Sequence, residues 1–240
     1  MRILITNDDS IHSPVLPALI KWAKELGEVV VVVPKFEQSA KSHSVEIRKP
    51  FEVLPCNQFP GVRAYTVDSS PADCVRYAIL GLHETFDLVI SGINLGFNIG
   101  WDLFYSGTVA AAMEAVSFGC RAIALSTDKG DFSPALSRLD EVWALFEKEK
   151  LLEQNLIYNV NIPTEVKGIR ITRQGGPYFT DEFPSVGEHM VQAIGTCIYE
   201  ENHDYTVDTN AVMHGYISIT PLTTERTHLN TFHTLKHLNP

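Results

Sequence analysis

Five consecutive valines occupy positions 29–33, and this run limits the folds that the chain can adopt. β-Branched side chains favour an extended backbone, and an uninterrupted apolar run fits a strand that is buried on both faces. Strands of this kind occur in parallel sheets that helices cover on both sides. The run therefore predicts a central strand of an α/β sheet over residues 28–34.

Strand and helix patterns alternate on either side of this run. Further strands are predicted over residues 3–6, 62–67, 86–90, 121–126 and 156–162. Helices are predicted to begin at Ser13-Pro14 and to end at Gly27, to begin at Ser70-Pro71, and to span residues 108–118 and 134–149. This alternation indicates a doubly wound, mostly parallel, Rossmann-like sheet in a three-layer α/β/α arrangement.

The pattern changes after about residue 165. Residues 168–174 and 211–220 are predicted to be strands, residues 175–177 and 199–208 to be loops, and the tail from 223 to 240 is polar. We predict a catalytic core over residues 1–165 and a smaller β-rich extension over residues 166–240. Because the extension has little core of its own, we expect it to mediate assembly into a homo-oligomer.

Composition narrows the class of protein. The 240 residues are 45% hydrophobic and carry a net charge of −10, which argues against binding to extended nucleic acid because that requires many Lys and Arg contacts. The four cysteines include no CxxC pair, which favours reduced thiols. We find neither a signal peptide nor a membrane-spanning stretch, so we expect a soluble cytoplasmic protein that does not bind membranes.

Asp8 and Asp9 follow the first predicted strand, where ligands bind in open α/β sheets. Two carboxylates converge here only if the chain turns, and they then repel each other unless a cation lies between them. Oxygen ligands favour Mg²⁺, Mn²⁺ or Ca²⁺. Taken alone, the pair fits a metal site and an ordinary loop or helix cap equally well.

Glycine alternates with asparagine in residues 91–100, after another predicted strand. Asn94 and Asn98 offer amide groups to a cation or a phosphate. The glycine spacing fits neither a dinucleotide fingerprint nor a P-loop. A purely structural loop is the alternative interpretation.

A predicted helix begins at Ser106, whose hydroxyl is typical of an N-cap. The free N–H groups of Gly107 and Thr108 would bind an anion, although most such caps bind no ligand. Three polar clusters thus follow sheet strands and should meet along one edge. A fourth cluster, residues 38–44, holds Ser39, Lys41 and His43, and its spacing alone favours a solvated loop.

Together these segments resemble the SurE family of 5′/3′-nucleotidases. The most specific match is the run SGINLGFNIGWDLFYSGTVAAAME at residues 91–114, and ITNDD and SPADCV match as well. The resemblance implies release of phosphate from nucleoside monophosphates and assembly as a homodimer or homotetramer. It also implies one divalent ion, Mg²⁺ or Mn²⁺, held by Asp8, Asp9, Ser39 and Asn94, and a phosphate pocket around Asn98, Ser106, Gly107 and Thr108.

The chain departs from the family pattern at three loop glycines, which are replaced by Ser10, Ala40 and Ser69. A side chain restricts positive φ, so these replacements are expected to shift the loops that shape substrate access. The four metal positions are intact.

The residues favour attack by a metal-activated water, with Asp8 or Asp9 accepting its proton and with Asn98 and Ser106 stabilising the phosphoryl charge. The rival is Ser106 as a covalent nucleophile, activated in space by His43 or Lys41. Two other functions stay open. One is a phosphatase that acts on other small phosphoesters or polyphosphate, and the other is an inactive nucleotide-binding regulatory protein.

Overall fold

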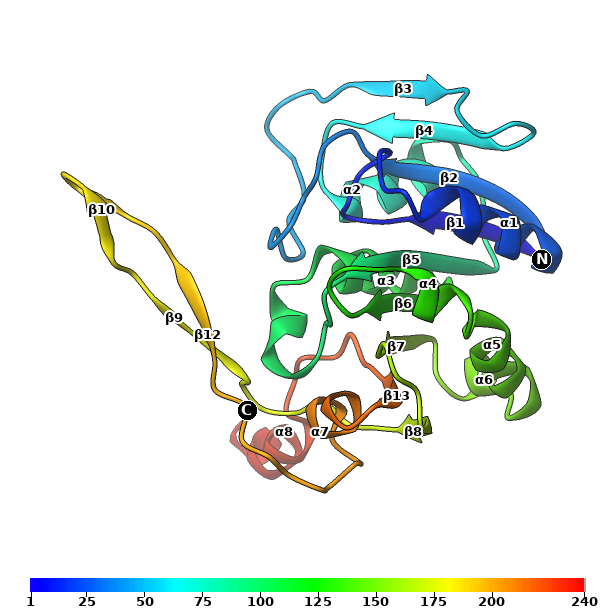
Figure 1. Cartoon of the computed structure of the whole chain (residues 1–240). Coiled ribbons are helices and arrows are strands. Elements are labelled where there is room, and N and C mark those ends of the chain that lie inside the picture. Colours follow the sequence, from blue (N-terminus) through cyan, green and yellow to red (C-terminus); the bar gives the residue numbers. More distant parts are fainter. Residues whose placement is uncertain (240) are drawn as a thin grey trace.

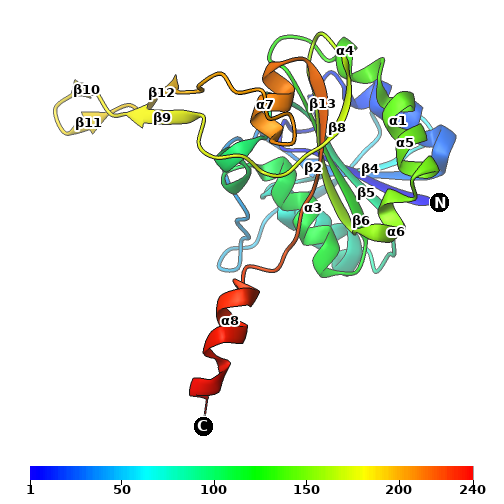
Figure 2. The ribbon, with the colours of Figure 1, turned by 90° about the horizontal axis from the view of Figure 1, so that it is seen from below.

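The valine run forms β2 (Glu28–Pro34), and its side chains divide between the two faces of one sheet. Val29, Val31 and Val33 pack into one apolar layer, whereas Val30 and Val32 pack into the other. Because successive strand residues point to opposite faces, each face needs a cover, and helices lie on both sides (Figures 1 and 2). The computed structural model describes residues 1–239 and confirms the predicted α/β fold with a mostly parallel sheet.

Within the described residues, nine strands form the main sheet in the order β3-β4-β2-β1-β5-β6-β7-β13-β8. Besides β2, they are β1 (Arg2–Thr6), β3 (Val53–Cys56), β4 (Arg63–Val67), β5 (Leu88–Leu95), β6 (Arg121–Thr127), β7 (Ile157–Ile162), β8 (Gly168–Ile171) and β13 (Tyr216–Pro221). Only the β3/β4 and β7/β13 pairs among them are antiparallel. The chain winds outward from β1 through β2 to β4 and then returns to β5, on the other side of β1. Such a reversal is where open α/β sheets bind ligands.

Helices cover the two faces in pairs. The longest on the first face are α1 (Leu16–Leu26) and α5 (Leu139–Lys148), and α2 (Pro71–Arg76) and α3 (Gly107–Ser117) cover the second. Short helical segments complete the connections: η1 (Tyr77–Gly81), η2 (Gly100–Phe104), α4 (Ser133–Leu136) and α6 (Leu151–Gln154). The N-cap predicted at Ser70 is confirmed, because its Oγ accepts a hydrogen bond from the Asp73 N–H over 3.1 Å.

Two helix predictions were wrong in detail. Ser13 does not cap α1, because the helix begins only at Leu16 and has Pro17 in its first turn. The helix predicted over residues 134–149 breaks between α4 and α5. At the break the Ser137 hydroxyl donates to the Pro134 carbonyl over 2.8 Å, a local bond that competes with continued helix.

The strand predicted over residues 211–220 was wrong in its first half. Residues Asp208–Met213 form helix α7, and β13 starts only at Tyr216. Gly215 adopts φ +83° between them, which ends the helix and turns the chain into the strand. The short apolar run at 211–213 fits either structure. The domain boundary at residue 165 stays a prediction, and both β8 and β13 beyond it join the main sheet.

Two segments project from the body of the protein. One is the arm, residues 179–197, in which β9 (Phe179–Glu182) pairs with β12 (Ile194–Cys197) and β10 (Ser185–Gly187) pairs with β11 (Met190–Val191) (Figure 1). The other is α8 (Leu229–Leu235) with the short η3 (Lys236–Leu238), which extends away from the sheet in Figure 2. The predicted polar tail thus contains a helix, and its last residue, Pro240, lies outside the described residues.

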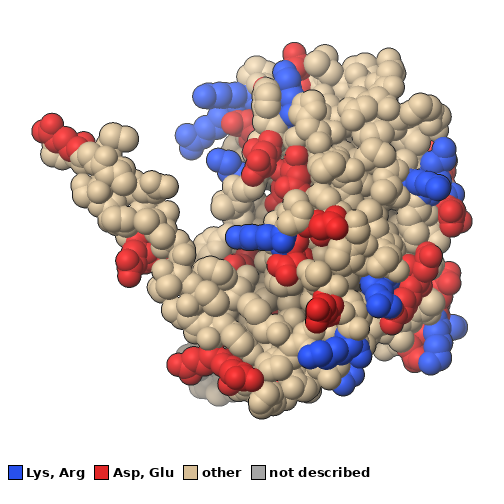
Figure 3. All heavy atoms as spheres, viewed as in Figure 1, with Lys and Arg blue, Asp and Glu red and all other residues tan. Residues whose placement is uncertain are grey.

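The surface carries both signs of charge. On the face shown in Figure 3, basic and acidic side chains are interspersed, and those of the described residues form no continuous basic stripe. None of the helices within residues 1–239 combines the length and the apolar character that crossing a bilayer requires. All four cysteines are unpaired.

Candidate functional site

Asp8 and Asp9 lie directly after β1, beside the point where the sheet winding reverses. The chain turns sharply at Ser10, which adopts φ +73° and accepts a hydrogen bond from the Asn7 side-chain amide over 2.9 Å. Both carboxylates line the same cleft. The turn therefore brings together two neighbouring side chains that an extended strand would separate.

Burial makes this pair electrostatically costly. It raises the pKa of Asp8, and it raises the pKa of Asp9 to about 7 with help from the Asp8 and Glu37 carboxylates. The Oδ2 atom of Asp9 is buried without a hydrogen-bond partner. Like charges in a buried site are destabilising unless a cation compensates them. The unpaired oxygen and the all-oxygen surroundings fit a divalent cation.

The other two predicted ligands line this cleft as well. Asn94 is the second-last residue of β5 and follows an irregularity in the pairing of β5 with β6. Its side-chain amide donates to the Gly96 carbonyl over 2.8 Å. That bond leaves the amide oxygen as the available ligand atom. Ser39 lies in the exposed loop after β2 and donates its hydroxyl proton to Glu37 over 2.6 Å. The residues gave no signal for Glu37, whose carboxylate also lines the cleft and raises the pKa of both Asp8 and Asp9.

The N-terminus of α3 lies against Asp8. Ser106 caps it, since its Oγ accepts from the Val109 N–H over 3.1 Å, and it lines the cleft. Gly107 and Thr108 are buried and are not among the residues that line the cleft. A Cβ at Gly107 would lie 3.1 Å from the Asp8 Cβ, so glycine lets the helix start against the carboxylate. Thr108 is fully buried and donates its hydroxyl proton to Asp8 Oδ1 over 2.6 Å.

Asn98 is held by a buried set of polar side chains. Its carbonyl accepts from the amides of Asn159 and Asn161 over 2.7 and 3.0 Å, and its N–H donates to Asn161 over 2.8 Å. Its own amide donates to the Ser126 hydroxyl over 2.8 Å. These supporting residues escaped the sequence analysis, although alternating asparagines in an otherwise apolar strand were a visible signal. They fix Asn98 firmly at the cleft.

Asp208, at the start of α7, holds the segment η2, which lines part of the cleft. Its fully buried carboxylate accepts from the N–H groups of Gly100, Gly175 and Thr209 over 3.0, 2.8 and 2.6 Å. Burial raises its pKa, which those three bonds oppose. The C-terminal part of the chain therefore anchors η2, which carries cleft residues including Trp101.

Aromatic side chains line much of the remaining cleft, which has a volume of about 1110 Å³. They are Phe97, Trp101, Tyr105, Tyr178 and Phe179. The last comes from the arm, which stands away from the body and bounds one side of the hollow (Figure 3). The lining of the cleft thus combines the predicted polar residues with aromatic side chains.

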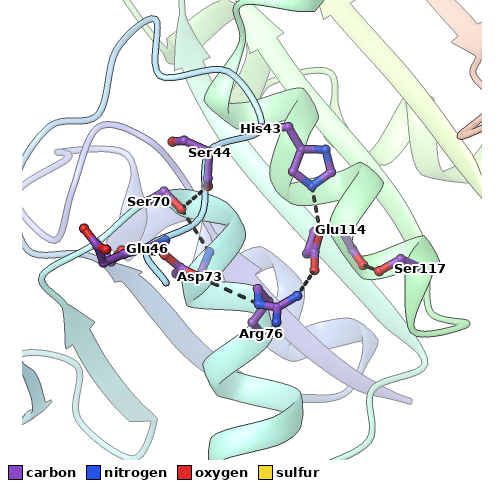
Figure 4. A network of polar contacts seen from close by, with 9 residues as sticks. His43, Ser44, Glu46, Ser70, Asp73, Arg76, Glu114 and Ser117 are labelled. Atoms are coloured by element: carbon purple, nitrogen blue, oxygen red, sulfur yellow. Dashed lines mark hydrogen bonds and ion pairs between the residues drawn. The ribbon is translucent and has the colours of Figure 1, made fainter. Parts of the chain in front are cut away.

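A network of polar contacts anchors the loop that carries Ser39 (Figure 4). His43 Nε2 lies 2.7 Å from one Glu114 carboxylate oxygen, and Arg76 lies 2.9 Å from the other. Ser70 donates its hydroxyl proton to the Ser44 carbonyl over 2.6 Å. The network ties this loop to α2 and α3, so residues 42–46 are fastened to the fold rather than simply solvated.

Two of the replaced glycines keep the backbone that glycine favours. Ser10 has φ +73° and Ala40 has φ +56°. The loops at these two positions therefore retain left-handed conformations despite their side chains. Ser69 shows a different adaptation, because its hydroxyl donates to the Asp73 carboxylate over 2.5 Å.

Comparisons with known proteins identify relatives of this chain in sequence and in fold. A family model described as Survival protein SurE matches residues 3–181. A Thermus thermophilus protein named 5′-nucleotidase SurE 1 is 41% identical over 244 residues, covering 95% of this chain and 93% of the relative. A Syntrophotalea carbinolica protein named 5′-nucleotidase SurE is 38% identical, covering 98% of this chain and 96% of the relative. A crystal structure of the SurE protein from Aquifex aeolicus superposes with a TM-score of 0.78 at 33% identity and covers 100% of both chains.

Proposed function

The chain belongs to the SurE family, and from this membership we propose that it is a metal-dependent phosphatase that releases phosphate from nucleoside 5′- and 3′-monophosphates. One observation carries the proposal: the buried Asp8 and Asp9 carboxylates share a cleft with the capped N-terminus of α3. A cation at the carboxylates and the helix N-terminus would attract the two sides of one phosphate group.

We propose that Asp8, Asp9, Ser39 and Asn94 hold one Mg²⁺ or Mn²⁺ ion per subunit. All four offer oxygen atoms, which these hard cations prefer. The buried, unpaired Oδ2 of Asp9 is the atom that most needs such a partner. When bound, the ion supplies positive charge to a phosphoryl oxygen and lowers the pKa of a water molecule.

Side chains of the protein would accept the proton of the water and bind the phosphoryl oxygens. Asp8 or Asp9 would accept the proton of the attacking water. Asn98 and Ser106 would donate to the phosphoryl oxygens, together with the N–H groups at the start of α3. The Thr108 hydroxyl binds Asp8, and the Thr108 backbone N–H bonds to the same carboxylate.

The aromatic side chains that line the cleft support a nucleotide as the substrate. They include Phe97, Trp101, Tyr105 and Tyr178, and Trp101 is 53% exposed. Aromatic faces of this kind stack on nucleobases without demanding one base. Other small phosphoesters and polyphosphate would have no base to stack on these side chains.

We also propose that the protein is a cytoplasmic homodimer or homotetramer assembled through its C-terminal extension. The arm exposes Phe183, Val186, Met190 and Val191, and α8 with η3 exposes Leu229, Phe232, Leu235 and Leu238. Exposed apolar side chains gathered on projecting segments favour contact with another subunit. The unpaired cysteines fit a reducing compartment.

The test is phosphate release from a panel of nucleoside 5′- and 3′-monophosphates, sugar phosphates and polyphosphate. Each substrate is assayed after chelation and again with Mg²⁺ or Mn²⁺ restored. We expect metal-dependent release that is fastest with nucleotides. Rates that are no higher with metal than with chelator would contradict the proposal, and nucleotide binding without release would show a binding protein instead.

A further inference from the structure

A second group of metal-ligating side chains lies at the base of the arm, apart from the residues that line the cleft. Glu201 and His203 belong to the loop between β12 and α7, and His214 directly follows α7. The Nε2 atoms of His203 and His214 lie 3.8 and 3.6 Å from the same carboxylate oxygen, Glu201 Oε1. One ligand atom from each residue falls within 4.8 Å of the other two.

Both imidazole rings are oriented by bonds to their other nitrogen. His214 Nδ1 lies 2.9 Å from the Asn210 carbonyl, which can only accept, so Nδ1 carries the proton in the neutral ring and Nε2 presents its lone pair. His203 Nδ1 lies 3.0 Å from the Tyr205 hydroxyl. Proteins commonly hold metal-binding histidines in this way, with the second nitrogen bonded to an oxygen.

The aromatic surroundings hold these rings in place as well. The Tyr205 ring lies 5.0 Å from the His214 ring and 5.0 Å from the Tyr216 ring, measured between centroids. His203 and His214 themselves lie 5.1 Å apart by the same measure. Tyr205 therefore packs against one histidine and hydrogen-bonds to the other, which brings the loop and the end of α7 together.

We propose that Glu201, His203 and His214 form a binding site for a borderline transition-metal ion such as Zn²⁺. Two imidazole nitrogens and one carboxylate oxygen form a ligand set found in zinc sites, with water completing the tetrahedron. Zinc bonds of about 2.0–2.1 Å place tetrahedral ligands roughly 3.3 Å apart. The separations of 3.6 and 3.8 Å exceed this value only slightly, and the exposed Glu201 and His203 side chains can move toward the half-buried His214. This nitrogen-containing set selects different ions from the all-oxygen set at Asp8 and Asp9.

Such an ion would fasten the base of the arm to the wall of the cleft. The loop that holds Glu201 and His203 continues directly from β12 of the arm. Through His214 the ion would also hold the end of α7. Within this helix Asp208 binds the Gly100 N–H and Met213 lines the cleft. The bound ion would therefore stabilise the arm in its present position.

The test uses the full chain with Asp9→Asn in the background, so that binding at the cleft is removed. Metal-free protein is titrated with Zn²⁺ in equilibrium dialysis and with Co²⁺ while its visible absorption is followed. We expect one strongly bound ion and the intense Co²⁺ bands of a four-coordinate site. His203→Ala or Glu201→Gln should weaken binding by roughly 100-fold or more, because even supporting partners of a metal ligand are worth 10–100-fold.

Both substitutions lie at exposed positions, so the fold should tolerate them. His189→Ala is the matched control, because His189 also lies beside a glutamate, Glu188, at 3.9 Å, but in the turn of the arm. It should bind Zn²⁺ as the Asp9→Asn background does. If the background protein binds no Zn²⁺, or if His203→Ala and His189→Ala bind it equally, the proposal is overturned and the cluster is an ion pair.

Discussion

Thr108 donates its hydroxyl proton to Asp8 Oδ1 across 2.6 Å, although the two residues are 100 positions apart in the chain. The bond joins the first turn of α3 to the end of β1. It opposes the rise in the pKa of Asp8 that burial causes, and it fixes the direction of the carboxylate. The helix that supplies the proposed phosphate site therefore also orients the proposed metal ligand.

Thr108→Val tests this relationship, because valine keeps the shape of threonine and loses the donor. We expect the Mg²⁺ or Mn²⁺ concentration needed for half-maximal phosphate release to rise roughly 10–100-fold, as for other supporting partners of metal ligands. Activity should recover largely at saturating metal. Thr108→Ser retains the hydroxyl and serves as the control. An unchanged metal requirement in Thr108→Val would show that Asp8 needs no such orientation.

Asp9 should give the metal-free protein a distinctive pH dependence. Its pKa is raised from 3.8 to about 7 in the folded state, so the folded protein keeps this proton while the unfolded chain has already lost it. The Asp9 contribution to the free energy of unfolding therefore falls as pH rises from about 4 to about 7, and the loss is complete above that range. Asp9→Asn should abolish turnover and flatten this part of the profile.

Urea unfolding at a series of pH values, in the presence of chelator, measures the effect. Glu153→Gln removes an exposed carboxylate whose side chain is 63% accessible, and its profile should follow the parent. A parental profile in Asp9→Asn would mean that this carboxylate is not the group responsible. Substantial turnover by Asp9→Asn at saturating metal would remove it from the proposed ligands.

Local patterns predicted the sheet and the positions of the polar clusters, but not what supports them. The valine run of β2 is typical of a buried strand, and Asp8 and Asn94 follow strands that were predicted from apolar runs. Asn159 and Asp208 act on Asn98 and Gly100 from 61 and 108 positions away, so no local pattern contains these contacts. The Ser39 loop was assigned through the family resemblance alone, because its anchor through His43 and Glu114 is equally long-range.

Ala40→Gly should stabilise the protein, because Ala40 holds φ +56° next to the cleft. A left-handed conformation costs an ordinary residue roughly 1–2 kcal/mol, and the added chain entropy of glycine returns roughly 0.5–1 of this. We therefore expect a gain of about 0.5–1 kcal/mol in the free energy of unfolding, measured with urea.

Two adjacent exposed positions supply the controls for this prediction. Lys150 has φ +50° and should also gain from glycine, whereas Glu149 has φ −92° and should lose. If Ala40→Gly is destabilising while Lys150→Gly stabilises, the Ala40 methyl group makes a contact that outweighs the backbone cost.

His43→Ala should loosen the loop that carries Ser39, since it removes the 2.7 Å contact with Glu114. We expect weaker metal binding with a smaller effect on kcat at saturating metal, because the carboxylates remain in place. Metal titrations of phosphate release measure both quantities. His12→Ala, at an exposed position after β1, is the control. If both variants require the same metal concentration for phosphate release, the contact between His43 and Glu114 does not support metal binding.

Ser106 distinguishes the two mechanisms that the residues leave open. Its Oγ accepts from the Val109 N–H, and His43 Nε2 lies against Glu114, so neither contact activates Ser106 as a nucleophile. If Ser106 binds phosphate and caps α3, Ser106→Ala should lower kcat on the order of 100- to 1,000-fold and stability by about 1 kcal/mol. The remaining activity should still depend on metal, and Ser106→Thr should recover part of it.

A nucleophilic Ser106 would instead leave Ser106→Ala inactive, and acid-quenched enzyme would carry phosphate on Ser106. Mass spectrometry during turnover of a nucleoside monophosphate therefore decides between the mechanisms, and we expect an unmodified Ser106.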